Sequence, residues 1–160
     1  MSVNVEARTI GPGDDAHVEE AWELKERIRT EEGVLKQRRR FFTSSYRRST
    51  VYAYVTTGDG GSLVAFAATR RDGYILFLAV APEFRGEGYG KRLVARVADD
   101  YANVTCHARA SNQSALDFYQ HIGFEIERRT TSYYEDGGDA YYLRLGDGGL
   151  REKLSRLVGL

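Results

Sequence analysis

The stretch PEFRGEGYGKRL, residues 82–93, decides how this chain folds, because it places glycines at 86, 88 and 90 at a junction of two elements. An apolar run, YILFLAVA at 74–81, precedes it, and a helix is expected over KRLVARVADDYA at 91–102. Glycine is unfavourable inside strands and helices, so three glycines here need a reason. Backbone N–H groups at a helix N-terminus bind anions, and glycines let a phosphate approach them closely. The stretch therefore predicts a phosphate-binding turn between a strand and a helix.

The remaining patterns predict an α/β or α+β domain with a mixed sheet. Alternating and apolar runs favour strands at 3–10, 49–57, 62–70, 74–80, 103–110, 124–134 and 139–145. Helices are expected from Asp14 or Asp15 onward, within 31–47, after the glycines, over 111–124, and at about 148–159. The turn GDGG at 58–61 indicates a hairpin. No repeat or linker divides the chain, so we expect one domain over residues 1–160.

Composition excludes several classes of protein. The chain has 160 residues, 42% of them hydrophobic and 29% charged, which is typical of globular proteins. Lys plus Arg and Asp plus Glu are 23 each, so no net field favours nucleic acid. Cys106 stands alone, which excludes an intramolecular disulfide and a cysteine-cluster metal site. Without a signal-peptide pattern or an apolar run of about 20 residues, we expect a cytoplasmic, metal-free protein with no membrane contact.

Two familiar phosphate-binding loops fit the glycine stretch badly. A P-loop needs GxxxxGK[ST], but Arg92 follows Lys91 here. A Rossmann turn needs GxGxxG in an N-terminal βαβ unit, whereas this GxGxG lies mid-chain after an antiparallel hairpin. A third pattern fits well. The run Val80-x-Pro82-x-x-Arg85-Gly86-x-Gly88-x-Gly90 resembles the acetyl-coenzyme A pyrophosphate loop of the GCN5-related N-acetyltransferase (GNAT) superfamily.

This resemblance continues through Asn112-x-x-Ala115-x-x-Phe118-Tyr119-x-x-x-Gly123-Phe124 and covers about residues 51–145. It implies the GNAT acyl-CoA N-acyltransferase fold, whose mostly antiparallel mixed sheet splays between strands 74–80 and 104–109 to hold acetyl-CoA. A main-chain N–H near Ala79 or Val80 would stabilise the oxyanion. The residues expected to contact the cofactor are Ala79, Val80, Arg85, Gly86, Gly88, Tyr89, Gly90, Lys91, Asn112 and Tyr119. Asn112 also suits the role of a helix N-cap, and both roles are compatible.

The resemblance also implies catalytic residues. Tyr119 would lie near the thioester sulfur and act as a general acid, although packing beside Leu116 is the alternative. His107 stands where many members carry glutamate. It resembles the base of N-terminal acetyltransferases that work alone and pair a histidine with a tyrosine on the preceding strand, here Tyr74. An imidazole with a pKa near 6.5 accepts a proton at neutral pH, and the alternative is a structural strand-end histidine. We expect His17 and His121 to be surface residues, and Cys106 to face the core.

The segment TSYYEDGGDAYYL, residues 131–143, resembles the substrate-binding hairpin of ribosomal-protein and N-terminal acetyltransferases. On that basis Tyr133 and Tyr134 are expected to hold the acceptor peptide; aromatic residues of an ordinary hairpin are the alternative. The chemistry favours an α-amine, because neutralising it at pH 7 costs about 1 kcal/mol, against about 4.6 kcal/mol for lysine.

We therefore expect an acetyl-CoA-dependent N-acetyltransferase that acts on a peptide or protein N-terminus by direct attack in a ternary complex. A small-amine acetyltransferase and a non-catalytic acyl-CoA-binding module are the rival hypotheses. The basic run KQRRR at 36–40, with Arg47 and Arg48, is expected to form a solvated helix face near the acceptor site. Nucleic acid is disfavoured there, and an acidic acceptor is an option. The C-terminal helix would be a lid or a dimer contact, which leaves monomer and homodimer open.

Overall fold

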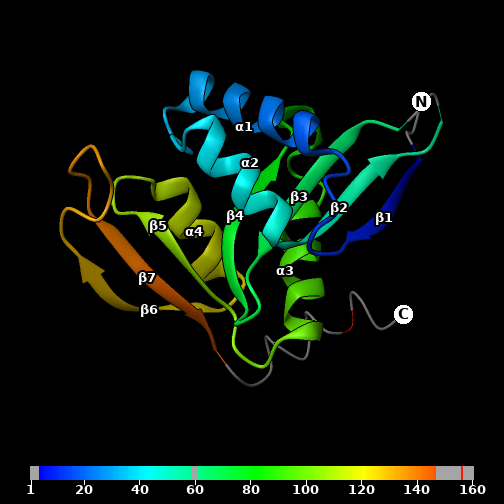
Figure 1. Cartoon of the computed structure of the whole chain (residues 1–160). Helices are drawn as coiled ribbons and strands as arrows, with labels where there is room; N and C mark the ends of the chain where they lie inside the picture. Colours follow the sequence, from blue (N-terminus) through cyan, green and yellow to red (C-terminus); the bar gives the residue numbers. More distant parts are fainter. Residues whose placement is uncertain (1–3, 59–60, 147–155, 157–160) are drawn as a thin grey trace.

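The computed structural model describes residues 4–58, 61–146 and 156, and in them seven strands form one mixed sheet with helices on both faces (Figure 1). The strands are β1 (Val5–Ile10), β2 (Thr50–Thr56), β3 (Leu63–Thr69), β4 (Tyr74–Val80), β5 (Thr105–Arg109), β6 (Phe124–Thr130) and β7 (Ala140–Leu145). The helices are α1 (Val18–Glu32), α2 (Arg39–Arg48), α3 (Tyr89–Asp100) and α4 (Gln113–His121), with a short 3₁₀ turn at Pro82–Phe84. The predicted mixed sheet is confirmed, and its order is β1-β2-β3-β4-β5-β7-β6.

Each face of the sheet carries its own apolar core. Helices α1 and α2 cover one face, where Phe42 and Tyr46 of α2 pack on Phe66 of β3 and are fully buried. Helices α3 and α4 cover the other face, where Leu93 and Leu116 belong to a second cluster. Burial of this much apolar surface is the main force that holds the layers together.

The sheet opens at its centre, between β4 and β5. These two strands are parallel, but they pair only at Tyr74 with Thr105 and at Ile75 with Cys106. Gly73 lies at the point of closest approach, because a Cβ added there would come within 1.9 Å of the Asn103 carbonyl oxygen. Beyond this point the strands diverge into a fork, and the expected splay is confirmed (Figure 1).

A bulge in β4 turns the strand just inside this fork. Ala68 of β3 is opposite Phe77, and Thr69 is opposite Ile75, so Leu76 has no opposite residue. A bulge reverses which face the following side chains occupy. Accordingly Ile75 belongs to the core under α3 and α4, whereas Phe77 belongs to the core under α1 and α2.

Three expectations about individual elements need correction or lie outside the described residues. Helix α1 begins at Val18 rather than at Asp14 or Asp15, because the Asp14 carboxylate accepts a hydrogen bond from the Ala16 N–H in a tight turn. Strand β6 ends at Thr130, so Tyr133 and Tyr134 lie in a loop rather than in a strand. The helix expected at about 148–159 lies outside the described residues. None of the helices in the described ranges is long and apolar enough to cross a membrane.

Candidate active site

The three glycines of the turn are needed for two different structural reasons. Gly86 and Gly88 have positive φ angles, 82° and 86°, and an added Cβ at either would meet no protein atom within 4 Å. These glycines serve the backbone conformation, which side chains rarely adopt. Gly90 is different, because an added Cβ would lie 3.1 Å from the Phe118 ring of α4. It lets α3 and α4 pack closely.

The turn presents a row of unpaired backbone donors at the N-terminus of α3. Among the described residues, no protein atom accepts a hydrogen bond from the N–H groups of residues 86–91, and the first paired amide is that of Arg92. Such a row, with the helix dipole behind it, is an anion site. The row contains the N–H groups of Tyr89 and Lys91, and the Tyr89 ring packs against Tyr54.

Arg85, expected to bind the cofactor, has two protein contacts. Its Nη2 lies 2.7 Å from the Glu32 carboxylate at the end of α1, and its Nε donates to the Val80 carbonyl at 3.3 Å. A neighbouring ion pair, Arg27 with Glu83, also joins α1 to the turn. The side chain is exposed, so the structure holds Arg85 beside the amide row by a contact that solvent screens strongly.

The fork supplies a second set of backbone donors. Ala81 donates its N–H to Val64 of β3, and antiparallel pairing alternates the side to which donors point. By this alternation Leu78 and Val80 direct their N–H groups into the fork, whereas Ala79 directs its N–H toward β3. Of the two residues expected to supply the oxyanion donor, therefore, Val80 has the suitable orientation and Ala79 does not.

His107 and Tyr74 meet at the base of the fork, on the face covered by α1 and α2. The Tyr74 hydroxyl lies 2.6 Å from His107 Nδ1, within hydrogen-bond distance. The Tyr133 ring stacks on the imidazole with centroids 4.2 Å apart, and Tyr142, opposite His107 on β7, packs against it as well. The imidazole is thus held in one orientation by three aromatic side chains.

The surroundings of this pair shift both groups toward their neutral forms. Burial, and then the cations Arg128 and Arg70, lower the pKa of His107 below its ordinary value of 6.5. Burial, and then the neighbouring Tyr133 hydroxyl, raise the pKa of Tyr74. Burial opposes the charged form of any group, so the two shifts have opposite signs. At neutral pH the site holds an uncharged imidazole beside an uncharged phenol.

Tyr119 lies on the other face of the sheet, in the core with Leu116. Its side chain is 8% exposed and packs edge-on against Phe118 and Phe124. Burial, and then the neighbouring Cys106 thiol of β5, raise the pKa of Tyr119 well above its ordinary value. Cys106 is buried as expected, with its side chain opposite to that of His107. The phenol therefore stays protonated beneath the fork.

Asn112 is the N-cap of α4, where its side-chain oxygen accepts a hydrogen bond from the Ala115 N–H at 3.1 Å. This confirms the structural role expected for it. The side-chain amide group remains available to a second partner, because capping uses only the oxygen.

Contacts with Arg109 of β5 hold the loop that carries Tyr133 and Tyr134. Arg109, two residues after His107, donates to both oxygens of Asp136 at 3.1 Å, and its guanidinium lies 4.0 Å from the Tyr134 ring centroid. The Gly138 N–H, then Arg109 and Lys36, lower the pKa of Asp136. Asp136 therefore stays charged and keeps the two tyrosines near His107.

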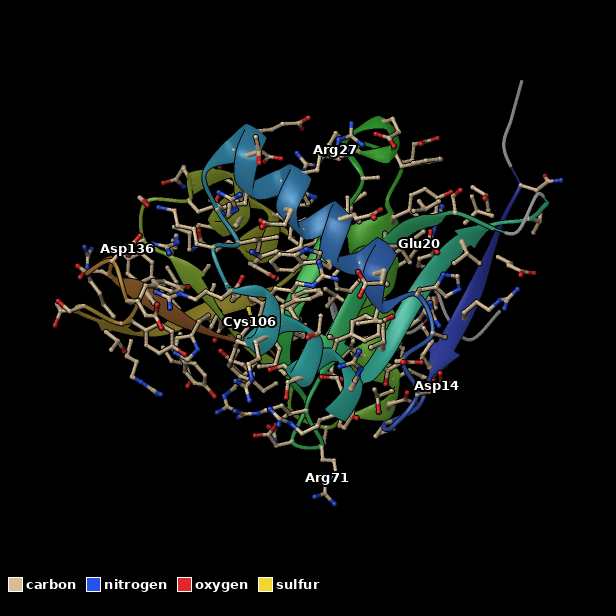
Figure 2. All side chains as sticks on the ribbon, turned by 45° about the horizontal axis from the view of Figure 1, so that its top comes forward. Asp14, Glu20, Arg27, Arg71, Cys106 and Asp136 are labelled. Carbon is tan, nitrogen blue, oxygen red and sulfur yellow. The ribbon has the colours of Figure 1, made fainter. Side chains whose placement is uncertain are left out.

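Two ion pairs join this loop to the segment between α1 and α2, about 100 residues away in the sequence. Lys36 lies 3.1 Å from Asp136, and Arg38 lies 3.8 Å from Glu135. We call these contacts the loop clasp. Asp136 can be followed in Figure 2 at the edge of the molecule, beside that segment.

Sequence reasoning missed several residues around the His107–Tyr74 pair. Arg109 could have been found, because residues two apart on a strand share a face. Tyr142 and Asp136 required the pairing of β5 with β7 and the fold of the loop. The expectation that His17 is a surface residue is wrong, because it is half-buried at the start of α1, with its Nδ1 2.8 Å from the Glu20 carboxylate. His121 is exposed, as expected.

The forked sheet and the amide-lined turn at its open end match the arrangement that the resemblance to the GNAT superfamily implies. The chain belongs to the acetyltransferase (GNAT) family, whose model matches residues 16–124. Among curated relatives, N-alpha-acetyltransferase 30 of Xenopus laevis is 39% identical over 80 residues, which are 47% of this chain and 29% of that protein. The chain thus spans less than a third of that relative's length.

Solved structures share the fold at lower identity. The ribosomal-protein-S18-alanine N-acetyltransferase of Escherichia coli superposes with a TM-score of 0.69 at 21% identity, over 91% of this chain and 96% of that one. Arabidopsis thaliana Naa50, in complex with the bisubstrate analogue CoA-Ac-MVNAL, gives a TM-score of 0.65 at 20% identity, over 88% and 99%. These likenesses support the expected fold.

Proposed function

We propose that this protein is an N-acetyltransferase that transfers the acetyl group of acetyl-CoA to the α-amino group of a peptide or protein. One observation carries the proposal: a His107–Tyr74 pair within hydrogen-bond distance lies at the base of a fork whose open end bears a row of free amides. The names of the relatives point the same way, since N-alpha-acetyltransferase 30 and the bisubstrate complex of Naa50 both concern peptide N-termini.

The cofactor site would use the amide row and the fork in series. The N–H groups of residues 86–91 would bind the diphosphate of coenzyme A, with Arg85 as an added cation after exchange from Glu32. The free amide of Asn112 and the N–H groups of Leu78 and Val80 would hold the pantetheine arm and the acetyl carbonyl. When bound, acetyl-CoA supplies the thioester that the acceptor attacks.

The protein's own groups would then handle the protons. In the tautomer whose Nδ1–H donates to the Tyr74 hydroxyl oxygen, Nε2 of His107 carries the lone pair that would accept the proton of the attacking amine, directly or through a water. A backbone N–H of Val80 would stabilise the oxyanion of the tetrahedral intermediate. Tyr119, kept protonated by burial, would donate a hydrogen bond to the sulfur of the departing thiolate, which would then take its proton from solvent. Because the ordinary pKa of a thiol is near 8.5, the thiolate would leave without full proton transfer from the phenol.

An α-amine suits this site better than a lysine side chain. A peptide α-amine has a pKa near 7.7–8.0, and an imidazole with a lowered pKa is a weak base. No carboxylate hydrogen-bonds to His107 among the described residues to strengthen it. Tyr133 stacks on the imidazole, Tyr134 packs edge-on against Tyr133, and both would contact the first residues of an acceptor peptide.

The test is a transfer assay that locates the acetyl group. The protein is incubated with acetyl-CoA and a peptide that offers a free α-amine and one internal lysine, and tandem mass spectrometry identifies the modified nitrogen. We expect acetylation of the α-nitrogen, and loss of at least about 100-fold in kcat/KM for His107→Gln, as for removal of a general base. Turnover of small amines with silence on every peptide would replace this proposal with the small-amine hypothesis.

A further inference from the structure

The exposed face of α2 borders a polar hollow that the catalytic proposal does not use. The hollow has a volume of about 510 Å³ and lies between α2 and the turn that joins β3 to β4. Its lining residues are Phe41, Ser45, Arg48, Ser49, Arg70, Arg71, Asp72 and Leu76. Phe41 is 54% exposed, which is unusual for so large an apolar side chain.

The charges of this hollow are unbalanced. Three arginines are among the residues that line it, but Asp72 is its one carboxylate, and Arg70 already binds Asp72 at 2.8 Å. The guanidinium of Arg48 donates to Ser44 Oγ at 3.1 Å and has no carboxylate partner among the described residues. Arg71 points outward from the tip of the turn (Figure 2). The hollow therefore carries a net positive charge.

Arg70 connects the hollow to the His107–Tyr74 pair. Its guanidinium lies 4.4 Å from the centroid of the Tyr74 ring, whose hydroxyl bonds to His107. On the other side of the imidazole, Arg128 lies 4.1 Å from the Tyr142 ring. An acceptor amine at His107 would therefore lie between the guanidinium groups of Arg70 and Arg128. The hollow begins at Arg70 and extends away from His107 along α2.

We infer that the hollow lined by Arg48, Arg70 and Arg71 selects acceptors that carry a carboxylate next to the reactive amine, that is, peptides with an acidic N-terminal segment. Guanidinium groups bind carboxylates through paired, charge-assisted hydrogen bonds, which gives the selection its chemistry. Phe41 and Leu76 provide apolar surface for the methylene groups of such a side chain. The inference rests on the proposed function and names the substrate class of the same site.

The basic segment at 36–40 was expected to form a helix face, but Lys36, Gln37 and Arg38 precede α2, which begins at Arg39. Lys36, Arg38 and Arg39 are each paired with a carboxylate, of Asp136, Glu135 and Glu19 respectively. These cations are therefore partly neutralised, whereas Arg48, the last residue of α2, has no carboxylate partner among the described residues. An extended nucleic-acid surface would need the first group free as well.

The test compares two peptides that differ only in charge: Ala-Glu-Glu and Ala-Gln-Gln at the N-terminus of one common sequence. The wild-type protein should acetylate the acidic peptide with a kcat/KM at least about tenfold higher, mainly through KM, and the preference should shrink as salt is raised. Arg48→Glu should bring the two peptides to within about twofold. Arg47→Glu is the matched control, because Arg47 is an exposed neighbour outside the hollow, and it should keep the preference.

The outcomes separate the two proposals. Equal kcat/KM for both peptides in the wild-type protein, or an unchanged preference in Arg48→Glu, would overturn the acidic acceptor and leave the acetyltransferase standing. Silence on both peptides would overturn the proposed function and this inference with it. Binding of RNA that Arg48→Glu abolishes, together with equal peptide rates, would assign the hollow to nucleic acid instead.

Discussion

Replacing Gly88 by alanine separates the backbone role of the glycine turn from its role toward a ligand. Gly88 has a φ of 86°, where a residue with a side chain costs about 1–2 kcal/mol. An added Cβ meets no protein atom within 4 Å, so no further steric cost is expected in the free protein. For a chain of 160 residues this loss corresponds to a fall in Tm of about 2–8 °C. The variant should therefore fold.

Gly13→Ala is the matched control, because Gly13 has a φ of 91° and equally open surroundings, but belongs to the turn before α1. Thermal unfolding should show similar losses for both variants. Isothermal titration with coenzyme A should then show a Kd at least about tenfold higher for Gly88→Ala alone, because the new methyl group displaces a phosphate from the amide row. Equal affinity in the two variants would refute the reasoning that this turn binds the diphosphate.

Three further changes test separate parts of the site. Tyr119→Phe should lower kcat about tenfold or more while the Kd for coenzyme A is retained, in steady-state kinetics and calorimetry; an effect confined to KM would mean that the ring only packs. Burial lowers the pKa of His107 below 6.5, so the imidazole is neutral at pH 7, and activity should be lost as the pH falls through that lower pKa and the base becomes protonated. In an NMR titration, the midpoint of His107 should rise in Arg128→Gln, because this change removes a neighbouring cation. A wild-type midpoint above 6.5 would contradict the assignment. Lys36→Glu opens the loop clasp at Asp136 and should raise the peptide KM a few-fold without changing coenzyme A binding, since an exposed ion pair contributes at most about 1 kcal/mol; an unchanged KM would remove the clasp from acceptor binding.

Local patterns in the sequence predicted those parts of the site that depend on neighbours along the chain. The glycine turn, the helix after it and the Asn112 cap follow from spacing alone, and the structure shows each of them. The pairing of Tyr74 with His107 came from a family resemblance. The contact itself depends on the short pairing between β4 and β5, which brings two residues 33 positions apart within hydrogen-bond distance.

Other features depend on tertiary contacts that no local pattern contains. Glycine is needed at position 90 because the Phe118 ring of α4 lies there. The sequence spacing alone assigned Gly90 the same phosphate-binding role as Gly86. Tyr133 and Tyr134 fit an aromatic strand by composition, but the Asp139 carboxylate accepts from the Ser132 N–H and from Arg129, which stabilises a loop there. The observed start of α1 differs from the predicted one for a similar reason, because the Asp14 carboxylate accepts from the Ala16 N–H in a turn rather than capping a helix.

The most direct test of the central claim follows the backbone amides of the turn while coenzyme A is titrated into ¹⁵N-labelled protein. The account predicts that the N–H signals of residues 86–91 shift together and more than those of any other segment, because these donors are unpaired in the free protein. It also predicts that Leu78 and Val80 shift next, as the arm of the ligand enters the fork. Binding of coenzyme A that leaves the signals of residues 86–91 unmoved would contradict the account.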